Sequence, residues 1–304
     1  MIKFKSLIDL LVALPNEQDC INYLEEYRWK GKVISPFDPN SKVYKCANNR
    51  YKCKNTNRYF NAKTGTIFEN SKISLQKWLW TLFTISSRKK GISSYQLARE
   101  LDITQKSAWF MLHRSRYTFD QSSFIKEMLK DFVEVDEAFI GGKNRNRHRD
   151  KRVPHSQGRN WKDKIPVLGM IERGGKLIAQ VVPNTKQITV NPIIRANIKE
   201  GSNLYTDEWY RHGDLYQDFN HEIVNHSLNQ YKKGNASTNT IENPWGHLKG
   251  TIRTYTHISR KHSQKYIDEF VLRFNTRKHE EKDRFDLVLL SSIGKRLTYQ
   301  QLIN

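Results

Sequence analysis

The spacing of apolar residues changes near Asp131, and this change limits the folds that the chain can adopt. Upstream, apolar side chains recur every three or four residues, which is typical of amphipathic helices. Downstream, residues 132–140 alternate, with Val133 and Val135 on one face and Glu134 and Asp136 on the other. A mainly helical first part, followed by interleaved strands and helices, predicts an α+β or mixed α/β chain.

Further strands and helices are predicted beyond the first strand. Residues 165–171 and 176–182 flank Arg173-Gly174-Gly175, which predicts a β-hairpin. Two more strands are predicted at 202–206 and 222–225. Helices are predicted before, between and after them, at 189–200, 208–216, 240–253 and 263–277.

The chain carries a large excess of positive charge. Its 304 residues include 52 Lys and Arg against 31 Asp and Glu, a net charge of +21. Both parts share the excess, with +12 over residues 1–130 and +9 over residues 131–304. The simplest partner for such a charge is a polyanion, most often nucleic acid.

Composition excludes several classes of protein. No apolar run approaches the ~18 residues of a membrane span, and three cysteines are too few for a disulfide-stapled secreted module. Residues 7–14 follow Lys3 and Lys5 as in a signal peptide, but Asp9 interrupts the stretch and no small-residue cleavage site follows. We therefore expect a folded cytoplasmic protein without a membrane partner.

The first 65 residues divide into helices and a small β element. Residues 6–14 and 16–29 predict two helices separated by Pro15. Residues 31–65 carry prolines, polar residues and short aromatic alternation, which indicates strands joined by turns.

Two short helices joined by a tight turn are predicted within residues 92–116. Ser93 or Ser94 caps the first helix, the turn passes Asp102, and Thr104 caps the second. The pair fits a helix-turn-helix, whose second helix enters the major groove of DNA; the alternative is an ordinary helical hairpin. In the DNA interpretation, four side chains of the second helix contact DNA: Gln105, Lys106 and His113 at base edges and Arg114 at phosphate.

The most basic stretch is residues 143–164, with nine Lys and Arg against two Asp. It lacks hydrophobic periodicity, which predicts a loop. One interpretation is a solvated insertion. The other is an arm that contacts the phosphates of flanking or target DNA through four arginines: Arg145, Arg147, Arg149 and Arg152.

Three carboxylates stand at positions where α/β folds build sites. Asp136 lies within a strand, Asp207 at the end of another, and Glu242 at the start of a helix. If the two strands are neighbours, the aspartates can face each other while Glu242 closes the site. Lys249 lies two helical turns beyond Glu242 on the same face. Taken singly, each residue fits a structural role as a helix cap or solvated group, but their order and spacing favour a joint site.

Three convergent carboxylates suit two hard cations. Mg²⁺ prefers oxygen ligands and keeps water and substrate phosphates in its coordination shell. Two such ions about 3.5–4 Å apart stabilise the attacking and leaving oxygens at a phosphodiester. We therefore expect two Mg²⁺ or Mn²⁺ ions held by Asp136, Asp207 and Glu242, with Lys249 reaching a phosphate.

Six segments carry a family resemblance when taken together: TGTIFENSKISLQKW (64–78), GISSYQLARELDITQKSAWFMLHR (91–114), EVDEAFIGGK (134–143), YTDEW (205–209), VNHS (224–227) and NTIENPWGHLK (239–249). On these segments the chain resembles the ISXO-like group of DDE transposases of bacterial insertion sequences. The resemblance implies a ribonuclease H-like catalytic domain with Asp136, Asp207 and Glu242 as the metal-binding triad and Lys249 as the lysine that often follows it. It also implies metal-dependent cleavage at transposon ends, after which the freed 3′-hydroxyl attacks target DNA.

The resemblance implies a domain order as well. We expect N-terminal helices with a zinc-ribbon-like lobe over residues 1–65, a helix-turn-helix region over 66–120, the catalytic domain over 131–280 and a helical tail over 281–304. Because two transposon ends must be joined, we expect a homodimer or larger assembly on double-stranded DNA, in a bacterial, nucleoid-associated setting.

The chain departs from the family at its zinc ligands. Many relatives pair CPxC with CxxC, but these positions read Ser35-Pro36-Phe37-Asp38 and Cys53-Lys54-Asn55-Thr56 here. One cysteine cannot hold a tetrahedral zinc ion, so we expect a degenerate lobe without structural zinc. Four aromatic residues are expected to stabilise it: Tyr44, Tyr51, Tyr59 and Phe60.

Two other functions remain open. A regulator derived from a transposase would bind the ends without cutting them, and a nuclease or resolvase would use the same metal chemistry. The three acids with Lys249 favour an enzyme over a silent regulator, and the helix-turn-helix favours recognition of element ends over general degradation.

Overall fold

A computed structural model describes residues 4–142, 144–154, 163–207, 214–224, 237–255 and 257–304. The chain divides into two compact units, each with its own core. Unit 1 comprises Met1–Phe119 and Lys278–Asn304, and unit 2 comprises Asp120–Arg277. The C-terminal segment is therefore part of unit 1.

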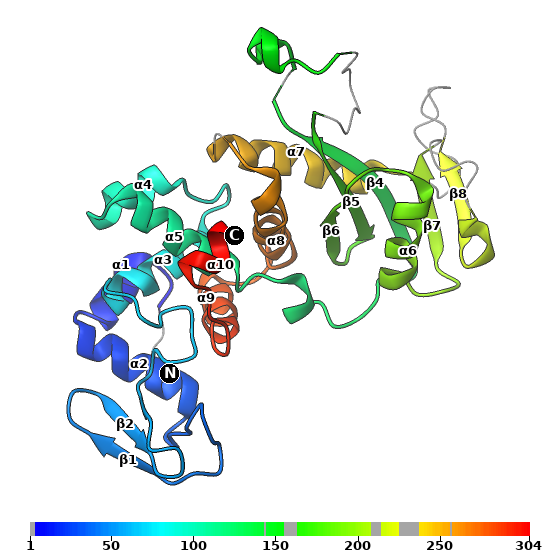
Figure 1. Cartoon of the computed structure of the whole chain (residues 1–304). Coiled ribbons are helices and arrows are strands. Elements are labelled where there is room, and N and C mark those ends of the chain that lie inside the picture. Colours follow the sequence, from blue (N-terminus) through cyan, green and yellow to red (C-terminus); the bar gives the residue numbers. More distant parts are fainter. Residues whose placement is uncertain (1–3, 143, 155–162, 208–213, 225–236, 256) are drawn as a thin grey trace. The chain divides into compact units, whose positions relative to one another are not determined.

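Unit 1 is mainly helical and is built around a buried helix, α3 (Figure 1). Helices α1, α2, α5 and α9 all pack against it. Hydroxyl groups of Ser74, Ser93 and Thr104 cap α3, α4 and α5 by accepting backbone N–H bonds, so the predicted starts of the helix pair are confirmed. The helices of unit 1 are α1 (Leu7–Ala13), α2 (Glu17–Trp29), α3 (Leu75–Ser87), α4 (Ser94–Leu101), α5 (Gln105–Arg116), α9 (Glu281–Ser291) and α10 (Tyr299–Ile303).

A small antiparallel sheet follows α2 in unit 1. Its strands are β1 (Val43–Cys46), β2 (Arg50–Cys53) and β3 (Tyr59–Phe60), in the order β1-β2-β3. Tyr51 and Phe60 are buried and pack edge-on against Trp29 of α2. Tyr44 and Tyr59, which we expected to stabilise this lobe, are instead exposed, because strand alternation places them on the opposite face.

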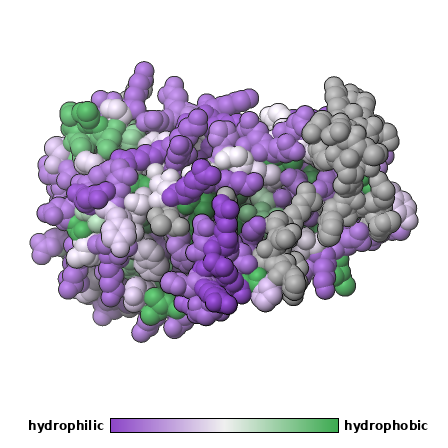
Figure 2. Space-filling model, turned by 90° about the horizontal axis from the view of Figure 1, so that it is seen from above, coloured by the Kyte–Doolittle hydropathy of each residue, from purple (hydrophilic) through white to green (hydrophobic). Residues whose placement is uncertain are grey.

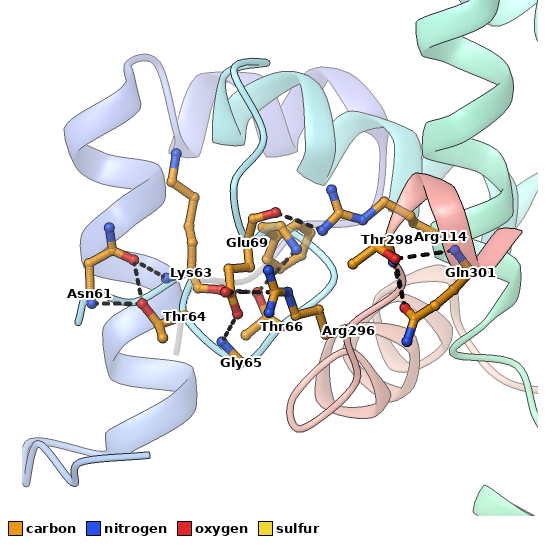
Figure 3. Close-up of polar contacts among 11 residues, drawn as sticks. Asn61, Lys63, Thr64, Gly65, Thr66, Glu69, Arg114, Arg296, Thr298 and Gln301 are labelled. Atoms are coloured by element: carbon orange, nitrogen blue, oxygen red, sulfur yellow. Dashed lines mark hydrogen bonds and ion pairs between the residues drawn. The ribbon is translucent and has the colours of Figure 1, made fainter. Parts of the chain in front are cut away.

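Glu69 organises the segment that precedes α3 (Figure 3). Its side chain accepts the backbone N–H of Gly65 at 2.7 Å and pairs with Arg296 at 3.3 Å. Its backbone carbonyl accepts a hydrogen bond of 2.8 Å from the Arg114 guanidinium. The TGTIFE segment is thus tied both to α5 and to the C-terminal segment.

Unit 2 contains a five-stranded mixed sheet. The sheet has the order β6-β5-β4-β7-β8, in which β4, β5 and β6 are antiparallel and β7 and β8 run parallel to β4. Its strands are β4 (Phe132–Ile140), β5 (Ile165–Glu172), β6 (Leu177–Val181), β7 (Asn203–Asp207) and β8 (Asn220–Val224). The predicted mixed α/β class is confirmed for this part of the chain.

Helices cover both faces of this sheet (Figure 1). Helix α6 (Gln187–Asn197) packs on the face that carries Val133 and Val135. Helices α7 (Asn239–Thr254) and α8 (Ser263–Asn275) pack on the opposite face, against Ala138 and Val167. The sheet is therefore the middle of three layers, and the even-numbered positions of β4 face α7.

Strand β6 is an edge of the sheet, and side-chain amides cover its outer side. Asn275 bonds both the N–H and the carbonyl of Leu177, at 2.8 and 2.9 Å. Gln121 does the same for Ala179, at 3.1 and 2.7 Å, and Gln264 accepts the N–H of the last residue of β6 at 2.7 Å. Three carboxamides thus make the hydrogen bonds that a sixth strand would make.

The described surface agrees with the polar composition. Hydrophilic residues dominate the face seen in Figure 2, and apolar residues form small separate patches on it. Among the described residues, no helix is both long enough and apolar enough to span a bilayer.

Candidate active site

Strand β4 is the element from which the site is built. The sequence alternation holds: Val133 and Val135 enter the core on the α6 side, while Glu134 and Asp136 point toward α7. Glu134 is fully buried and Asp136 is partly exposed. Two acids of one strand therefore face the same helix, one inside the protein and one at its surface.

Asp136 and Asp207 lie on neighbouring strands. Parallel pairing of β4 with β7 matches Glu134 with Tyr205, and each aspartate follows two residues later on its own strand. A step of two residues keeps the same face of the sheet, so the two aspartates lie level on one face, Asp136 in the middle of β4 and Asp207 at the carboxyl end of β7. Strands β4 and β7 are thus neighbours, which is the condition stated above for Asp136 and Asp207 to face each other. Asp207 is 5% exposed.

Helix α7 brings a second carboxylate and a lysine to Asp136. Glu242 and Lys249 are exposed, and both line an open cleft of about 540 Å³ together with Asp136. Their separation of seven residues places them on one side of the helix, as the sequence predicted. Glu137 and Lys164 also line this cleft, which makes it a strongly charged pocket with both signs present.

Trp245 links α7 to Asp136. Its indole N–H donates a hydrogen bond of 3.1 Å to Oδ2 of Asp136. The ring lies over Gly169, which is paired with Asp136 across β4 and β5. A Cβ atom at Gly169 would stand 2.3 Å from the ring, so only glycine leaves room for the indole at this position. Trp245 and Gly169 together define where the Asp136 carboxylate lies.

Glu134 holds the start of α7 against the sheet. It accepts the backbone N–H of Ile241 at 3.0 Å and pairs with Arg173 at 2.7 Å. Arg173 also donates to the hydroxyl of Ser237 at 2.8 Å and lies over the ring of Tyr205, 4.6 Å from its centroid. A carboxylate near the first N–H groups of a helix is favourable, and this one orients the helix that carries Glu242.

The oxygen donors in the cleft fit a hard divalent cation. Asp136 and Glu242 supply carboxylates to one open cleft, and carboxylates with water are the ligands that Mg²⁺ prefers. Within the described ranges, no three His, Cys, Asp or Glu side chains lie close enough together to form a metal cluster. The structure therefore groups Asp136 with Glu242 in the cleft, and Asp207 lies next to Asp136 on the adjacent strand.

The predicted DNA-contacting side chains of α5 fall into two groups. Lys106 is exposed, with its ammonium 5.3 Å from the ring centroid of Tyr299, and Gln105 is partly exposed and donates to Ser94. His113 and Arg114 are 0% and 4% exposed. Contrary to our expectation, these two side chains are not placed to contact DNA, because they pack inside unit 1. Burial also lowers the pKa of Arg114 to about 10.

The described part of the arginine-rich segment contains two 3₁₀ turns, Asn144–Asn146 and Arg149–Lys151. Arg147 donates to the carbonyl of Asp163 at 2.6 Å, and Arg152 donates to the carbonyls of Arg145 and Arg147. Two of the four predicted arginines thus shape the segment itself. Arg145 and Arg149 have exposed side chains.

The first pair of positions that match the family's zinc ligands lies in a polar turn. Ser35 is buried, and its hydroxyl accepts the N–H groups of Phe37 and Asp38 at 3.1 and 3.4 Å. Cys53 is buried beside it. Burial raises the pKa of this thiol, but hydrogen bonds from Ser35, Ser41 and Thr56 outweigh that effect and bring the pKa to about 6.

Sequence reasoning missed Glu134, Gly169, Arg173 and Trp245 as parts of the site. The alternation of β4 already places Glu134 beside Asp136, and an acid on a buried strand is a usable signal. The contact of Trp245 with Gly169 depends on the pairing of β4 with β5. Two predicted segments lie outside the described residues. They are the helix at 208–216, as far as residue 213, and the VNHS segment from Asn225 onward, which includes His226.

The chain is similar to proteins of transposable elements. Residues 128–275 match the ISXO2-like transposase domain. The chain is 25% identical over 291 residues to an uncharacterized protein in transposable element ISH50 of Halobacterium salinarum, covering 91% of this chain and 97% of that protein. It is 34% identical over 101 residues to an uncharacterized transposase-like protein of Haemophilus influenzae, covering 33% of this chain and 81% of that protein. Among solved structures, the Mos1 strand transfer complex is similar at a TM-score of 0.28 and 16% identity, covering 71% of this chain and 78% of that one.

Proposed function

Because the chain belongs to the ISXO2-like transposases, we propose that it cleaves DNA at the ends of an insertion element and joins the cut ends to target DNA. In this proposal unit 2 is a ribonuclease H-like catalytic domain. Asp136, Asp207 and Glu242 are the catalytic carboxylates, and Lys249 is a catalytic lysine. The observation that carries the proposal is the cleft that Asp136, Glu242 and Lys249 line together.

The proposed triad would hold Mg²⁺ or Mn²⁺, two ions when the substrate is bound. When bound, these ions would supply charge stabilisation at the attacking and leaving oxygens of the phosphodiester. Lys249 is exposed at the cleft and offers a cation to a phosphate of the substrate. Trp245 holds one oxygen of Asp136 in place, and Glu134 holds the start of the helix that carries Glu242.

We assign DNA recognition to both units. In unit 1, Gln105 and Lys106 at the start of α5 would read base edges as the second helix of a helix-turn-helix. In unit 2, Arg145 and Arg149 would contact the phosphates of flanking or target DNA. Joining two ends requires at least two active sites, so we propose that the protein acts as a dimer or larger assembly on double-stranded DNA.

Strand cleavage on labelled element-end DNA tests the proposal. Wild type with Mg²⁺ or Mn²⁺ should nick at the element end, and Glu242→Gln should bind the same DNA without cutting it, because the substitution keeps the shape and removes one metal-binding charge. Glu222→Gln, at an exposed position of β8, is the matched control and should cut like wild type. If wild type binds the ends and never cuts them, the protein is a DNA-binding regulator instead.

A further inference from the structure

The small sheet of unit 1 has one buried and one exposed face. Register pairs Tyr44 with Lys52, and Lys52 with Tyr59, so these three side chains lie side by side across the strands. Arg50 precedes Lys52 by two residues and shares its face. Tyr44 and Tyr59 are 42% and 51% exposed, whereas Tyr51 and Phe60 on the opposite face are buried.

Cations lie over both exposed rings. The Lys42 ammonium is 5.5 Å from the ring centroid of Tyr44. The Arg50 guanidinium and the Lys52 ammonium are 5.1 and 5.7 Å from that of Tyr59. Such cation–π contacts are weakly attractive, so the rings limit the freedom of three long side chains. A base that stacked on either ring would therefore compete with a cation already placed there.

The charge on this face is not neutralised. None of Lys42, Arg50 and Lys52 forms an ion pair with a carboxylate of the described residues. Residues 31–68 contain eight Lys and Arg and a single acid, Asp38. That acid is engaged by the side chain of Asn55 at 2.7 Å. Three ordered, uncompensated cations on a short sheet are complementary to the regular negative charge of a nucleic acid backbone.

We propose that this cationic face, formed by Lys42, Tyr44, Arg50, Lys52 and Tyr59, binds the phosphate backbone of duplex DNA without reading its sequence. The inference rests on the proposed function, in which the substrate is double-stranded DNA, and adds a contact surface to it. Single strands bind proteins largely through bases stacked on open aromatic faces, and here a cation lies over each exposed ring. Contacts to phosphate fix a position on DNA but carry no sequence information.

The test is the salt dependence of binding to a duplex of random sequence, measured with the full chain and without divalent metal. The triple variant Lys42→Gln/Arg50→Gln/Lys52→Gln removes the charges and keeps much of the side-chain length. Its plot of log Kd against log salt should be shallower than that of wild type by about 2.7, at about 0.9 for each lost phosphate contact. Affinity at about 50 mM salt should fall at least tenfold.

A second triple variant is the control, with the same loss of charge elsewhere in unit 1. Lys30, Lys32 and Lys45 are exposed and lie off the cationic face, and their change to Gln should leave the slope within about 1 of wild type, as expected if they make no phosphate contact. Circular dichroism and thermal unfolding establish that both triples are folded. Equal slopes for the two triples would overturn the proposal, because they would show a general effect of net charge.

Two further results distinguish binding of duplex DNA from binding of single strands, and this surface from the proposed enzyme activity. Tyr44→Leu/Tyr59→Leu should weaken duplex binding less than the charge triple does, and a larger loss on single-stranded than on duplex DNA would overturn the assignment to duplex. Metal-free binding is independent of cleavage. Failure of wild type to cut would therefore count against the proposed enzyme, while an unchanged slope in the charge triple would count against this surface alone.

Discussion

The indole nitrogen of Trp245 donates a hydrogen bond of 3.1 Å to Oδ2 of Asp136. One residue comes from the first strand of unit 2 and the other from a helix that begins about a hundred residues later. The bond occurs at the cleft that Asp136 shares with Glu242 and Lys249. In the proposed function Asp136 is a catalytic carboxylate, which must be held in orientation as well as in position, and this bond restrains its orientation.

Trp245→Phe should keep the ring over Gly169 and remove only the N–H. A hydrogen bond to a charged group is worth about 1.5–3 kcal/mol, so we expect Mn²⁺ binding, measured by calorimetry, to weaken by about tenfold or more, with a matching fall in cleavage. The control is Trp80→Phe, because the Trp80 nitrogen has no hydrogen-bond partner among the described residues. Equal effects of both substitutions would show that the N–H has no such role.

Gly169→Ala should destabilise unit 2. The added Cβ would meet the Trp245 ring at 2.3 Å, and overpacking of this kind typically costs about 1–3 kcal/mol. Gly142→Ala is the matched control, since a Cβ there has no neighbour within 4 Å. Thermal unfolding should show a lowered Tm for the first variant alone, and an unchanged Tm for Gly169→Ala would contradict the packing described.

Glu134→Ala should leave Arg173 without its buried partner and Ile241 without its acceptor. Removing one member of a buried ion pair costs about 3–5 kcal/mol, which chemical denaturation can measure. Glu222→Ala changes an exposed acid of β8 and should cost far less. A loss below about 1 kcal/mol for Glu134→Ala, the range of an exposed pair, would show that the bridge to α7 contributes little.

His221 should make unit 2 sensitive to mild acid. Burial lowers the pKa of His221 below its ordinary value of 6.5, so the unfolded chain binds a proton more readily than the folded one. Stability is then fully present above pH 6.5 and falls as the pH drops below it. His221→Gln removes the titration and retains a hydrogen-bonding partner for Thr206, 2.8 Å away in wild type. The fall in Tm between pH 7.5 and 5.5 should be smaller in this variant; an identical fall would assign the effect to other groups.

Lys106→Ala should weaken binding to element-end DNA by about 1–3 kcal/mol and relax the preference for that sequence. Competition between end DNA and random duplex measures both effects. An equal loss on the two DNAs would show that Lys106 contacts phosphate and not a base. Arg114→Ala is expected to act differently, by unfolding unit 1, because its side chain is buried and bonded to Glu69.

The sequence pattern correctly predicted those features of the structure that depend on residues close together in the chain. Strand alternation predicted that Glu134 and Asp136 share a face, and hydroxyl caps predicted the starts of α4 and α5. Helical periodicity predicted that Glu242 and Lys249 lie on one side of α7. Each of these depends on residues within a few positions of one another.

Contacts between distant segments could not be predicted in this way. The burial of Arg114 results from packing against Glu69 and Trp78, and hydropathy alone places an arginine on the surface. The relation of Trp245 to Asp136 requires the register of β4 with β5, which places Gly169 beneath the ring. Likewise, the place of Lys278–Asn304 in unit 1 follows from packing of α9 against α3.

The carboxamides along β6 have a consequence for self-association. An edge strand whose N–H and carbonyl groups are already bonded offers no template to a strand from another molecule. This edge is therefore protected from joining the sheet of another copy, as in the assembly proposed above, and from the irreversible aggregation that such joining starts. A contact between copies at the β6 side of unit 2 would therefore rest on side chains and not on backbone pairing with β6.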